Sequence, residues 1–373
     1  MYYQVSVFPC CILRFASFRS VFQGDVAGPA ESAASVASLH WVRSEIFRNF
    51  NPRMEPKEKA LGVCGMMGVA YVALLYAPAV FLPSPKSVRE HTLRRFAFAA
   101  VASSLAPILC LAFLPVNLGW ESDWREVLAV FGLRTDHLWQ AIILPTVLTG
   151  MLYLGPVALL LFYFIEWCWA ASHQENGLLR ETSSAVIAYG KDLASDILVW
   201  RNCFVAPVSE ELVFRACMVP LLLCGGFSPL VTVFLCPLFF GLAHLHHFWE
   251  LIYQKKHTKS TAALIVGMQL GYTTIFGWYA TFLYLRTGHL IVPIMAHIFC
   301  NTMGLPDIEE AMASSHRKVI GVAYIVGIVG FFTLLGPMSD PGLFNDVMVV
   351  KRCSCWSGFC KWAASHKLEK LVE

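Results

Sequence analysis

The sequence predicts an all-α membrane protein, a polytopic bundle of about eight transmembrane helices. Of its 373 residues, 57% are hydrophobic and only 14% are charged, whereas an average soluble domain is about 45–50% apolar and about 25% charged. Several stretches without Lys, Arg, Asp or Glu also reach the ~20 residues that a spanning helix needs. This composition excludes an ordinary cytosolic enzyme and a disordered chain, and the net charge of +3 gives no sign of a nucleic-acid partner.

The predicted spans follow from these charge-free stretches. In chain order they are residues 60–85, 96–120, 138–165, 216–249, 260–285, 287–306 and 319–339. The stretch 216–249 is too long for one span, and we divide it at Gly225, Gly226 and Pro229, because glycine and proline interrupt helices. No strand-like alternation is long enough to indicate a barrel.

The two ends of the chain differ from the central part. Residues 1–53 are mixed in composition and are predicted to be a poorly ordered N-terminal extension, either a signal or transit peptide or a segment upstream of a start at Met54. Residues 54–345 are assigned to the membrane-embedded domain and residues 346–373 to a C-terminal tail. Most of the 13 cysteines lie in apolar runs, where a free cysteine behaves as a small hydrophobic residue, and those of the tail have poor spacing for a metal site.

Basic residues in the connecting loops predict the orientation of the bundle. With alternating spans, twelve Lys and Arg residues fall on one side, whereas the opposite loops have only Arg125, Arg134 and Arg286. The twelve are Lys86, Arg89, Arg94, Arg95, Arg180, Lys191, Arg201, Lys255, Lys256, Lys259, Arg317 and Lys318. Because cytoplasmic loops are rich in Lys and Arg, the richer side is expected to face the cytosol.

Three ionisable residues lie close together in the otherwise apolar run 204–223. Glu210, Glu211 and Arg215 would each cost at least ~2.5–3.5 kcal/mol at mid-membrane depth. Glu211 and Arg215 are four residues apart, so they can form an ion pair on one face of a helix. Glu210 is rotated by about 100° from Glu211 and lies outside that pair, which suits a general base that works near neutral pH. The alternative interpretation is a structural ion-pair cluster that fixes helix packing.

Two further motifs place polar side chains at helical spacing. Phe240 and His244 are four residues apart on one face, and so are His297 and Asn301. Histidine and asparagine can both donate hydrogen bonds to a developing oxyanion. In the alternative interpretation they join membrane helices as structural contacts.

The predicted topology places all three motifs near one face of the membrane. Glu210, His244 and the pair of His297 and Asn301 each lie within about ten residues of a loop on the predicted cytosolic side, which puts them roughly 10–15 Å from that face. A shared cavity open to the cytosol is therefore expected. The next histidines along the chain, His246 and His247, are interpreted as interfacial residues.

These side chains together suit the hydrolysis of a peptide bond. Glu210 would deprotonate a water molecule that His244 positions, and Glu211 would orient Arg215. The oxyanion would be held by hydrogen bonds from the His297 motif. A water molecule bound to zinc by Glu and His ligands is one alternative. A proton-coupled transporter, in which intramembrane ionisable groups relay protons, is another.

The three motifs together resemble a known family. Glu-Glu-x-x-x-Arg at 210–215, Phe-x-x-x-His at 240–244 and His-x-x-x-Asn at 297–301, in this order on separate helices, are similar to the motifs of the CaaX prenyl protease 2 family. This is the Ras-converting type of glutamate intramembrane endopeptidase. The resemblance is close over residues 201–306, and the layout of eight spans extends it to about residues 60–340.

This resemblance implies a multi-pass protease of the endoplasmic reticulum membrane, with a conical catalytic cavity open to the cytosolic side. Such enzymes remove the last three residues of farnesylated or geranylgeranylated CaaX proteins, such as small GTPases, after the lipidated cysteine. The implied partners are these prenylated proteins and the lipid bilayer, with no nucleic acid, no metal and no cofactor. By motif position, the resemblance implies the catalytic roles given above for Glu210, Glu211, Arg215, His244, His297 and Asn301.

Overall fold

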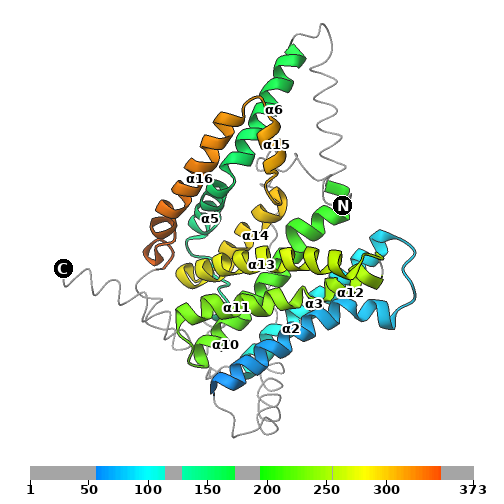
Figure 1. Cartoon of the computed structure of the whole chain (residues 1–373). Helices are drawn as coiled ribbons and strands as arrows, with labels where there is room; N and C mark the ends of the chain where they lie inside the picture. The colour runs from blue at the N-terminus through cyan, green and yellow to red at the C-terminus, as the bar shows by residue number, and fades with distance from the viewer. Residues whose placement is uncertain (1–55, 114–127, 173–193, 254, 346–373) are drawn as a thin grey trace, which may run out of the picture. The chain divides into compact units, whose positions relative to one another are not determined.

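A computed structural model describes residues 56–113, 128–172, 194–253 and 255–345 (Figure 1). Every element in this part of the chain is helical, and none of the described residues forms a strand, so the predicted all-α class is confirmed. The predicted N-terminal extension and C-terminal tail lie outside the described residues. In chain order the principal helices are α2 (Pro56–Phe81), α3 (Val88–Phe113), α5 (Leu138–Leu152), α6 (Leu154–Ser172), α8 (Ile197–Trp200), η3 (Arg201–Val205), α9 (Ala206–Glu211), η4 (Leu212–Cys217), α10 (Met218–Cys224), α11 (Pro229–Ala243), α12 (His246–Tyr253), α13 (Lys259–Thr287), α14 (Ile291–Met303), α15 (Ile308–Ala313) and α16 (Arg317–Met338).

The described residues form two compact units. The first, called here the α6/α16 unit, contains the described residues of 146–204 and 296–338. The second, the α2/α13 unit, contains those of 56–145, 205–295 and 339–345. The division falls within α5, η3 and α14, so these three elements contribute residues to both units.

Helices α2 and α3 pack together in the α2/α13 unit, and so do α11 and α13 (Figure 1). Two glycines let α11 and α13 approach closely. A Cβ atom at Gly277 would lie 2.5 Å from the Cβ of Pro237, and one at Gly241 would lie 2.8 Å from the Cδ1 of Leu270. Small residues allow such contacts between membrane helices, which van der Waals packing holds together. This packing fixes the position of α11, which ends next to His244.

The predicted break in the stretch 216–249 is confirmed. Helix α10 ends at Cys224 and α11 begins at Pro229. Gly226 between them has a φ of +90°, a backbone conformation that glycine adopts without steric cost. The side chain of Ser228 then accepts a hydrogen bond from the backbone N–H of Val231 and caps α11.

The α6/α16 unit is built around the two helices that name it, which pack side by side, and α15 contacts both. Glycines again allow the close approach. A Cβ atom at Gly155 on α6 would lie 2.4 Å from the ring of Tyr324 on α16, and one at Gly327 on α16 would lie 3.0 Å from the Cβ of Leu154 on α6. The short helix α15 is capped by Asp307, which accepts a hydrogen bond from the backbone N–H of Glu310 at 2.8 Å.

Four helical stretches of the described chain are long and apolar enough to cross a membrane. They are Lys57–Phe81, Val88–Phe113, Pro229–Tyr253 and Arg317–Met338. The predicted span 138–165 is instead divided into α5 and α6, which meet at 83° and would add a fifth candidate as a bent pair. The total is three below the about eight spans expected. Helix α14 has only 13 residues and α10 only 7, fewer than the ~20 that a span needs, and α13 has 29 residues but is not apolar enough to qualify.

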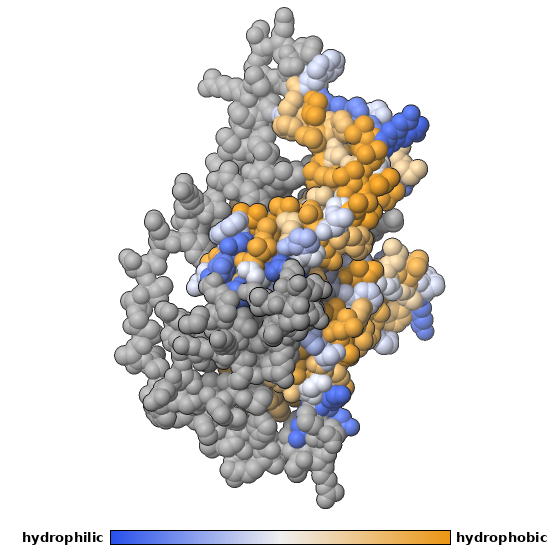
Figure 2. All heavy atoms as spheres, turned by 90° about the vertical axis from the view of Figure 1, so that its left-hand side faces the viewer, coloured by the Kyte–Doolittle hydropathy of each residue, from blue (hydrophilic) through white to orange (hydrophobic). Residues whose placement is uncertain are grey.

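The surface of these helices is strongly apolar. Exposed fractions reach 72% for Val69, 68% for Leu230 and 68% for Phe332. Figure 2 shows hydrophobic residues over most of the described surface on one face. Soluble monomers rarely expose contiguous apolar surface of this extent, whereas lipid chains cover it in a bilayer. The chain is therefore a polytopic membrane protein.

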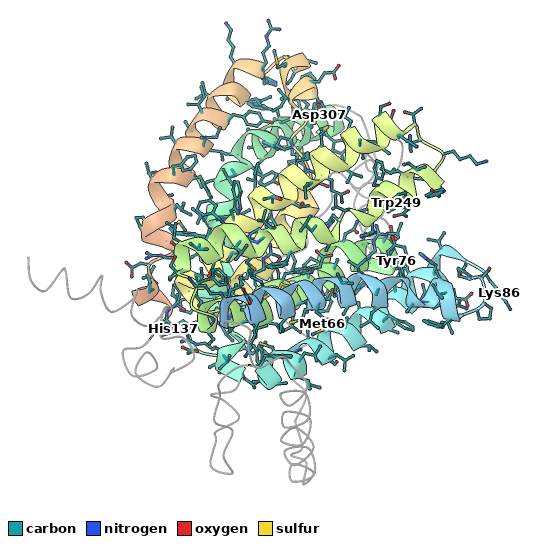
Figure 3. All side chains as sticks on the ribbon, turned by 60° about the horizontal axis from the view of Figure 1, so that its bottom comes forward. Met66, Tyr76, Lys86, His137, Trp249 and Asp307 are labelled. Atoms are coloured by element: carbon teal, nitrogen blue, oxygen red, sulfur yellow. The ribbon has the colours of Figure 1, made fainter. Side chains whose placement is uncertain are left out.

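The α2/α13 unit has two opposite ends. Figure 3 shows Lys86, in the turn between α2 and α3, at one end and His137, just before α5, at the other. At the His137 end, the guanidinium of Arg134 bonds to Asp136 and to the side chain of Asn345, and its Nη2 donates to the carbonyl of Phe344 at 3.1 Å. These contacts are called the Arg134 cluster below.

Three chain connections meet at this end of the unit. The N–H of Leu290 donates to the carbonyl of Gly132 at 2.9 Å, and Nε of Arg286 donates to the carbonyl of Ser339 at 3.2 Å. The predicted topology places these same connections together, on the side with few basic residues. The alternation of the spans across a membrane stays a prediction.

Candidate active site

The first predicted motif lies on a helical run that continues without a break from Ile197 to Cys224. Asp196 starts it by accepting a hydrogen bond from the N–H of Leu198 at 2.8 Å. Two π-helical segments, η3 and η4, interrupt the run directly before and after α9, which carries Glu210 and Glu211. Such π segments are rare and are frequent at functional sites, because they change the direction in which side chains point.

Glu211 and Arg215 form the predicted ion pair. Nη1 of Arg215 donates to Oε1 of Glu211 at 2.8 Å, and both side chains are fully buried. The guanidinium also lies 4.5 Å from the ring centre of Phe240 and 5.7 Å from that of Phe276. The charge is thus held by one carboxylate and two aromatic faces, a combination that is strong where water is excluded.

Glu210 differs from its neighbour in burial. Its side chain is partly exposed, whereas that of Glu211 is completely covered. Next to it, Oγ of buried Ser209 lies 2.9 Å from the hydroxyl of Tyr71 on α2. This hydrogen bond ties the glutamate-bearing helix to α2 at the residue before Glu210.

Our sequence interpretation missed Tyr71. It lies inside the predicted span 60–85, where a tyrosine hydroxyl is expected to find a polar partner. A tyrosine inside an apolar span therefore indicates a polar contact, but the sequence does not identify Ser209 as the partner. The ring of Tyr71 also packs edge-on against Phe214, with ring centres 5.5 Å apart.

His244 lies at the end of α11, beside the aromatic contact of Arg215. Its Nδ1 is 2.8 Å from the carbonyl oxygen of Phe240, and its ring centre is 4.8 Å from that of Phe240. Because a carbonyl only accepts, Nδ1 carries the proton, which makes Nε2 the nitrogen with the lone pair. Phe240 therefore contacts both Arg215 and His244, and it links the first two motifs in one unit.

His297 and Asn301 belong to the α6/α16 unit, whereas the other four predicted residues belong to the α2/α13 unit. His297 is buried, and Asn301 is exposed and donates from Nδ2 to the carbonyl of Asn202 at 2.9 Å. The accepting carbonyl lies in the π segment η3. The convergence of the two sets of residues on one cavity stays a prediction.

Comparison with known proteins identifies the family. Residues 194–303, which include all six predicted catalytic residues, match the family model described as Type II CAAX prenyl endopeptidase Rce1-like. The chain is 43% identical to CAAX prenyl protease 2 of Arabidopsis thaliana over 312 residues, which cover 81% of this chain and 96% of that protein. The chain belongs to the CAAX prenyl protease 2 family. The family resemblance seen in the motifs is therefore confirmed.

Relatives in this family come from distant organisms. CAAX prenyl protease 2 of Homo sapiens is 35% identical over 288 residues, which cover 76% of this chain and 82% of that protein. Probable CAAX prenyl protease 2 of Schizosaccharomyces pombe is 29% identical over 268 residues, covering 71% and 89%. No solved structure matches the chain.

Proposed function

We propose that this protein is an intramembrane endopeptidase that removes the C-terminal tripeptide from prenylated CaaX proteins. Membership of the CAAX prenyl protease 2 family supports the substrate class. The observation that carries the proposal is the linked arrangement of Glu211, Arg215, Phe240 and His244 beside a partly exposed Glu210. It provides a fixed, partly dry environment in which one carboxylate remains accessible for chemistry.

The proposed mechanism uses water as the nucleophile. Glu210 accepts a proton from the water as the water oxygen attacks the carbonyl carbon of the lipidated cysteine, and Nε2 of His244 accepts a second hydrogen bond from that water. His297 and Asn301 donate hydrogen bonds to the resulting oxyanion. The C–N bond then breaks, and the proton held by Glu210 passes to the leaving amine of the tripeptide.

Glu211 and Arg215 support this chemistry without touching the substrate. Their buried ion pair stabilises the helical run that carries Glu210. The ring of Phe240 contacts both Arg215 and His244, and it therefore fixes His244 relative to that run. No metal takes part in the proposed reaction. A chelator is therefore expected to leave tripeptide release intact.

The substrate suits a site near the membrane surface. A farnesyl or geranylgeranyl chain partitions into the bilayer, while the short peptide tail stays at the interface. We place the site in the endoplasmic reticulum membrane, open to the cytosol, where prenylated proteins such as small GTPases meet it. Two observations support this orientation. The basic residues gather in the loops of one predicted side, and the chain connections with few basic residues meet at one end of the α2/α13 unit.

Tripeptide release from a farnesylated CaaX peptide tests the proposal. Membranes containing the full chain should release the tripeptide, detected by mass spectrometry, and the same peptide without the farnesyl group should be cut much more slowly. His244→Ala should reduce release at least about 100-fold, since a positioned acid–base group contributes 10²–10⁴-fold. The control His91→Ala replaces an exposed histidine on α3 and should retain full activity. Release that is equal with and without the farnesyl group would contradict the proposed substrate class.

A further inference from the structure

Three side chains that the proposed mechanism does not use lie together on α12. The donor atoms of His246, His247 and Glu250 are all within 4.8 Å of one another, the one such group of three potential metal ligands among the described residues. The ring centres of the two histidines are 4.0 Å apart, and Nδ1 of His247 is 2.9 Å from Oε2 of Glu250. Ligand atoms of a tetrahedral zinc ion are about 3.5 Å apart, so small side-chain rotations would bring all three to one ion.

His246 has the protonation pattern of a metal ligand. Its Nδ1 lies within hydrogen-bond distance of the carbonyl oxygen of Ala243, which can only accept, so Nδ1 holds the proton and Nε2 holds a lone pair. That Nε2 atom is buried and has no hydrogen-bond partner among the described residues. A backbone carbonyl that fixes the tautomer of a histidine is a common outer-shell feature of metal sites.

The surroundings hold the cluster while leaving a route to it. The ring of Tyr76 packs edge-on against His246 at 5.1 Å between ring centres, and Figure 3 shows Tyr76 near α12. The side chains of His247 and Glu250 keep 31% and 26% of their surface exposed. Two cations act electrostatically on Glu250: Lys255, and Arg95, whose guanidinium lies 5.6 Å from the ring centre of Tyr76.

We propose that His246, His247 and Glu250 bind one divalent transition-metal ion, with Zn²⁺ as the best match. Two imidazoles and one carboxylate suit Zn²⁺, whereas Ca²⁺ and Mg²⁺ prefer oxygen ligands. The one negative charge of the carboxylate partly balances the ion. Three protein ligands leave a fourth position for water.

Bound zinc has a consequence for the neighbouring His244, whose ring centre is 5.9 Å from that of His247. An ion held by His247 would compete for the water that His244 positions in the proposed mechanism, so zinc is expected to inhibit proteolysis. This consequence rests on the proposed function, whereas zinc binding does not. Binding is therefore measured directly and without substrate.

The test uses the purified full-length protein in detergent, stripped of metal by a chelator and titrated with Zn²⁺ against a chromophoric chelator. The parent protein for this test carries the substitutions Cys353→Ser, Cys355→Ser and Cys360→Ser, so that thiolates of the C-terminal tail do not compete for zinc. We expect one Zn²⁺ per chain. Both His246→Ala and the more conservative Glu250→Gln should weaken the affinity at least about tenfold, because even outer-shell partners are worth 10–100-fold. The control His91→Ala should bind as tightly as the parent.

Cobalt substitution identifies the ligand atoms independently. Co²⁺ in the proposed site should give the visible absorption of a tetrahedral nitrogen and oxygen environment, and Glu250→Gln should change it. The proposal would be overturned if the parent bound no zinc, if both cluster variants bound it as tightly as the parent, or if cobalt gave a thiolate-to-cobalt charge-transfer band.

Discussion

Two arginines of the α2/α13 unit meet carboxylates in contrasting ways. Arg215 and Glu211 are both completely buried and lie four residues apart on one helical run. Arg134 bonds to Asp136, which keeps 33% of its side chain exposed, and to Asn345, 211 residues further along the chain. Water cannot reach either side chain of the Arg215 pair, whereas it reaches Asp136 and can replace part of the interaction with Arg134. Burial therefore decides how much each pair contributes to stability.

The largest expected effect follows from breaking the buried pair. Glu211→Ala should lower the free energy of unfolding by about 3–5 kcal/mol, because it leaves the guanidinium of Arg215 buried without a counter-ion. Thermal unfolding of the protein in detergent, followed by tryptophan fluorescence, measures this loss. The double variant Glu211→Leu/Arg215→Met should recover much of the stability and remain inactive. A single variant as stable as wild type would show that water reaches this pair.

The next effect is the pH dependence of buried His289, whose ring centre lies 6.4 Å from that of Phe344, next to the Arg134 cluster. Burial lowers the pKa of His289 to about 4, and the charge of Arg134 adds to the shift. The unfolded value is near 6.5, so neutral His289 stabilises the fold above that pH. Stability should fall by up to about 3 kcal/mol as the pH drops from 6.5 to 4. The melting temperature of His289→Gln should change less across this window than that of wild type. Parallel curves would contradict this assignment.

A smaller loss is expected when Arg134 itself is removed. Arg134→Ala should reduce the free energy of unfolding by about 1–2 kcal/mol, because its lost hydrogen bonds are partly replaced by water. Tripeptide release per folded molecule should be unchanged. The proposed site is expected near the side that carries Lys86, and the cluster lies at the opposite end of the unit. Activity assays normalised to folded protein measure this. If Arg134→Ala lost as much stability as Glu211→Ala, burial would not decide how much the two arginine pairs contribute.

The smallest effect concerns the hydrogen bond between α2 and α9. Tyr71→Phe removes the hydroxyl that contacts Ser209 and should cost about 1 kcal/mol of stability. Tripeptide release should fall a few-fold, because Ser209 positions the residue that follows it, Glu210. Tyr253→Phe, at a 72% exposed tyrosine, is the control and should change neither property. Equal activity of the two variants would show that this contact does not position Glu210.

The contrast between the arginines also explains what the sequence could predict. The pair of Glu211 and Arg215 follows from helical spacing alone, and so does the break at Gly225 and Gly226. The Arg134 cluster depends on long-range contacts that no local pattern encodes. The bend of 83° between α5 and α6 was missed for a related reason, since the apolar stretch 138–165 continues through it. Length and apolar character indicate that a segment is helical, but packing decides whether it is straight.

The candidate site divides in the same way. The residue types and spacings of the three motifs, at Glu210, His244 and His297, were together sufficient to predict the family. The aromatic link through Phe240, the π segments beside α9 and the contact of Tyr71 come from tertiary structure. The interpretation of His246 and His247 as interfacial residues did not include Glu250. The spacing of three residues between His247 and Glu250 predicts that they share a helix face, but it does not predict that they bind one metal ion.

Tripeptide release by Glu210→Gln decides whether Glu210 is the general base. The substitution keeps the size of the side chain and removes its ability to accept the proton of the water. The purified variant, compared with wild type in the same lipid nanodiscs, should keep its melting temperature and lose tripeptide release by at least about 100-fold. Substantial release by a folded Glu210→Gln protein would contradict the account of Glu210 as the base.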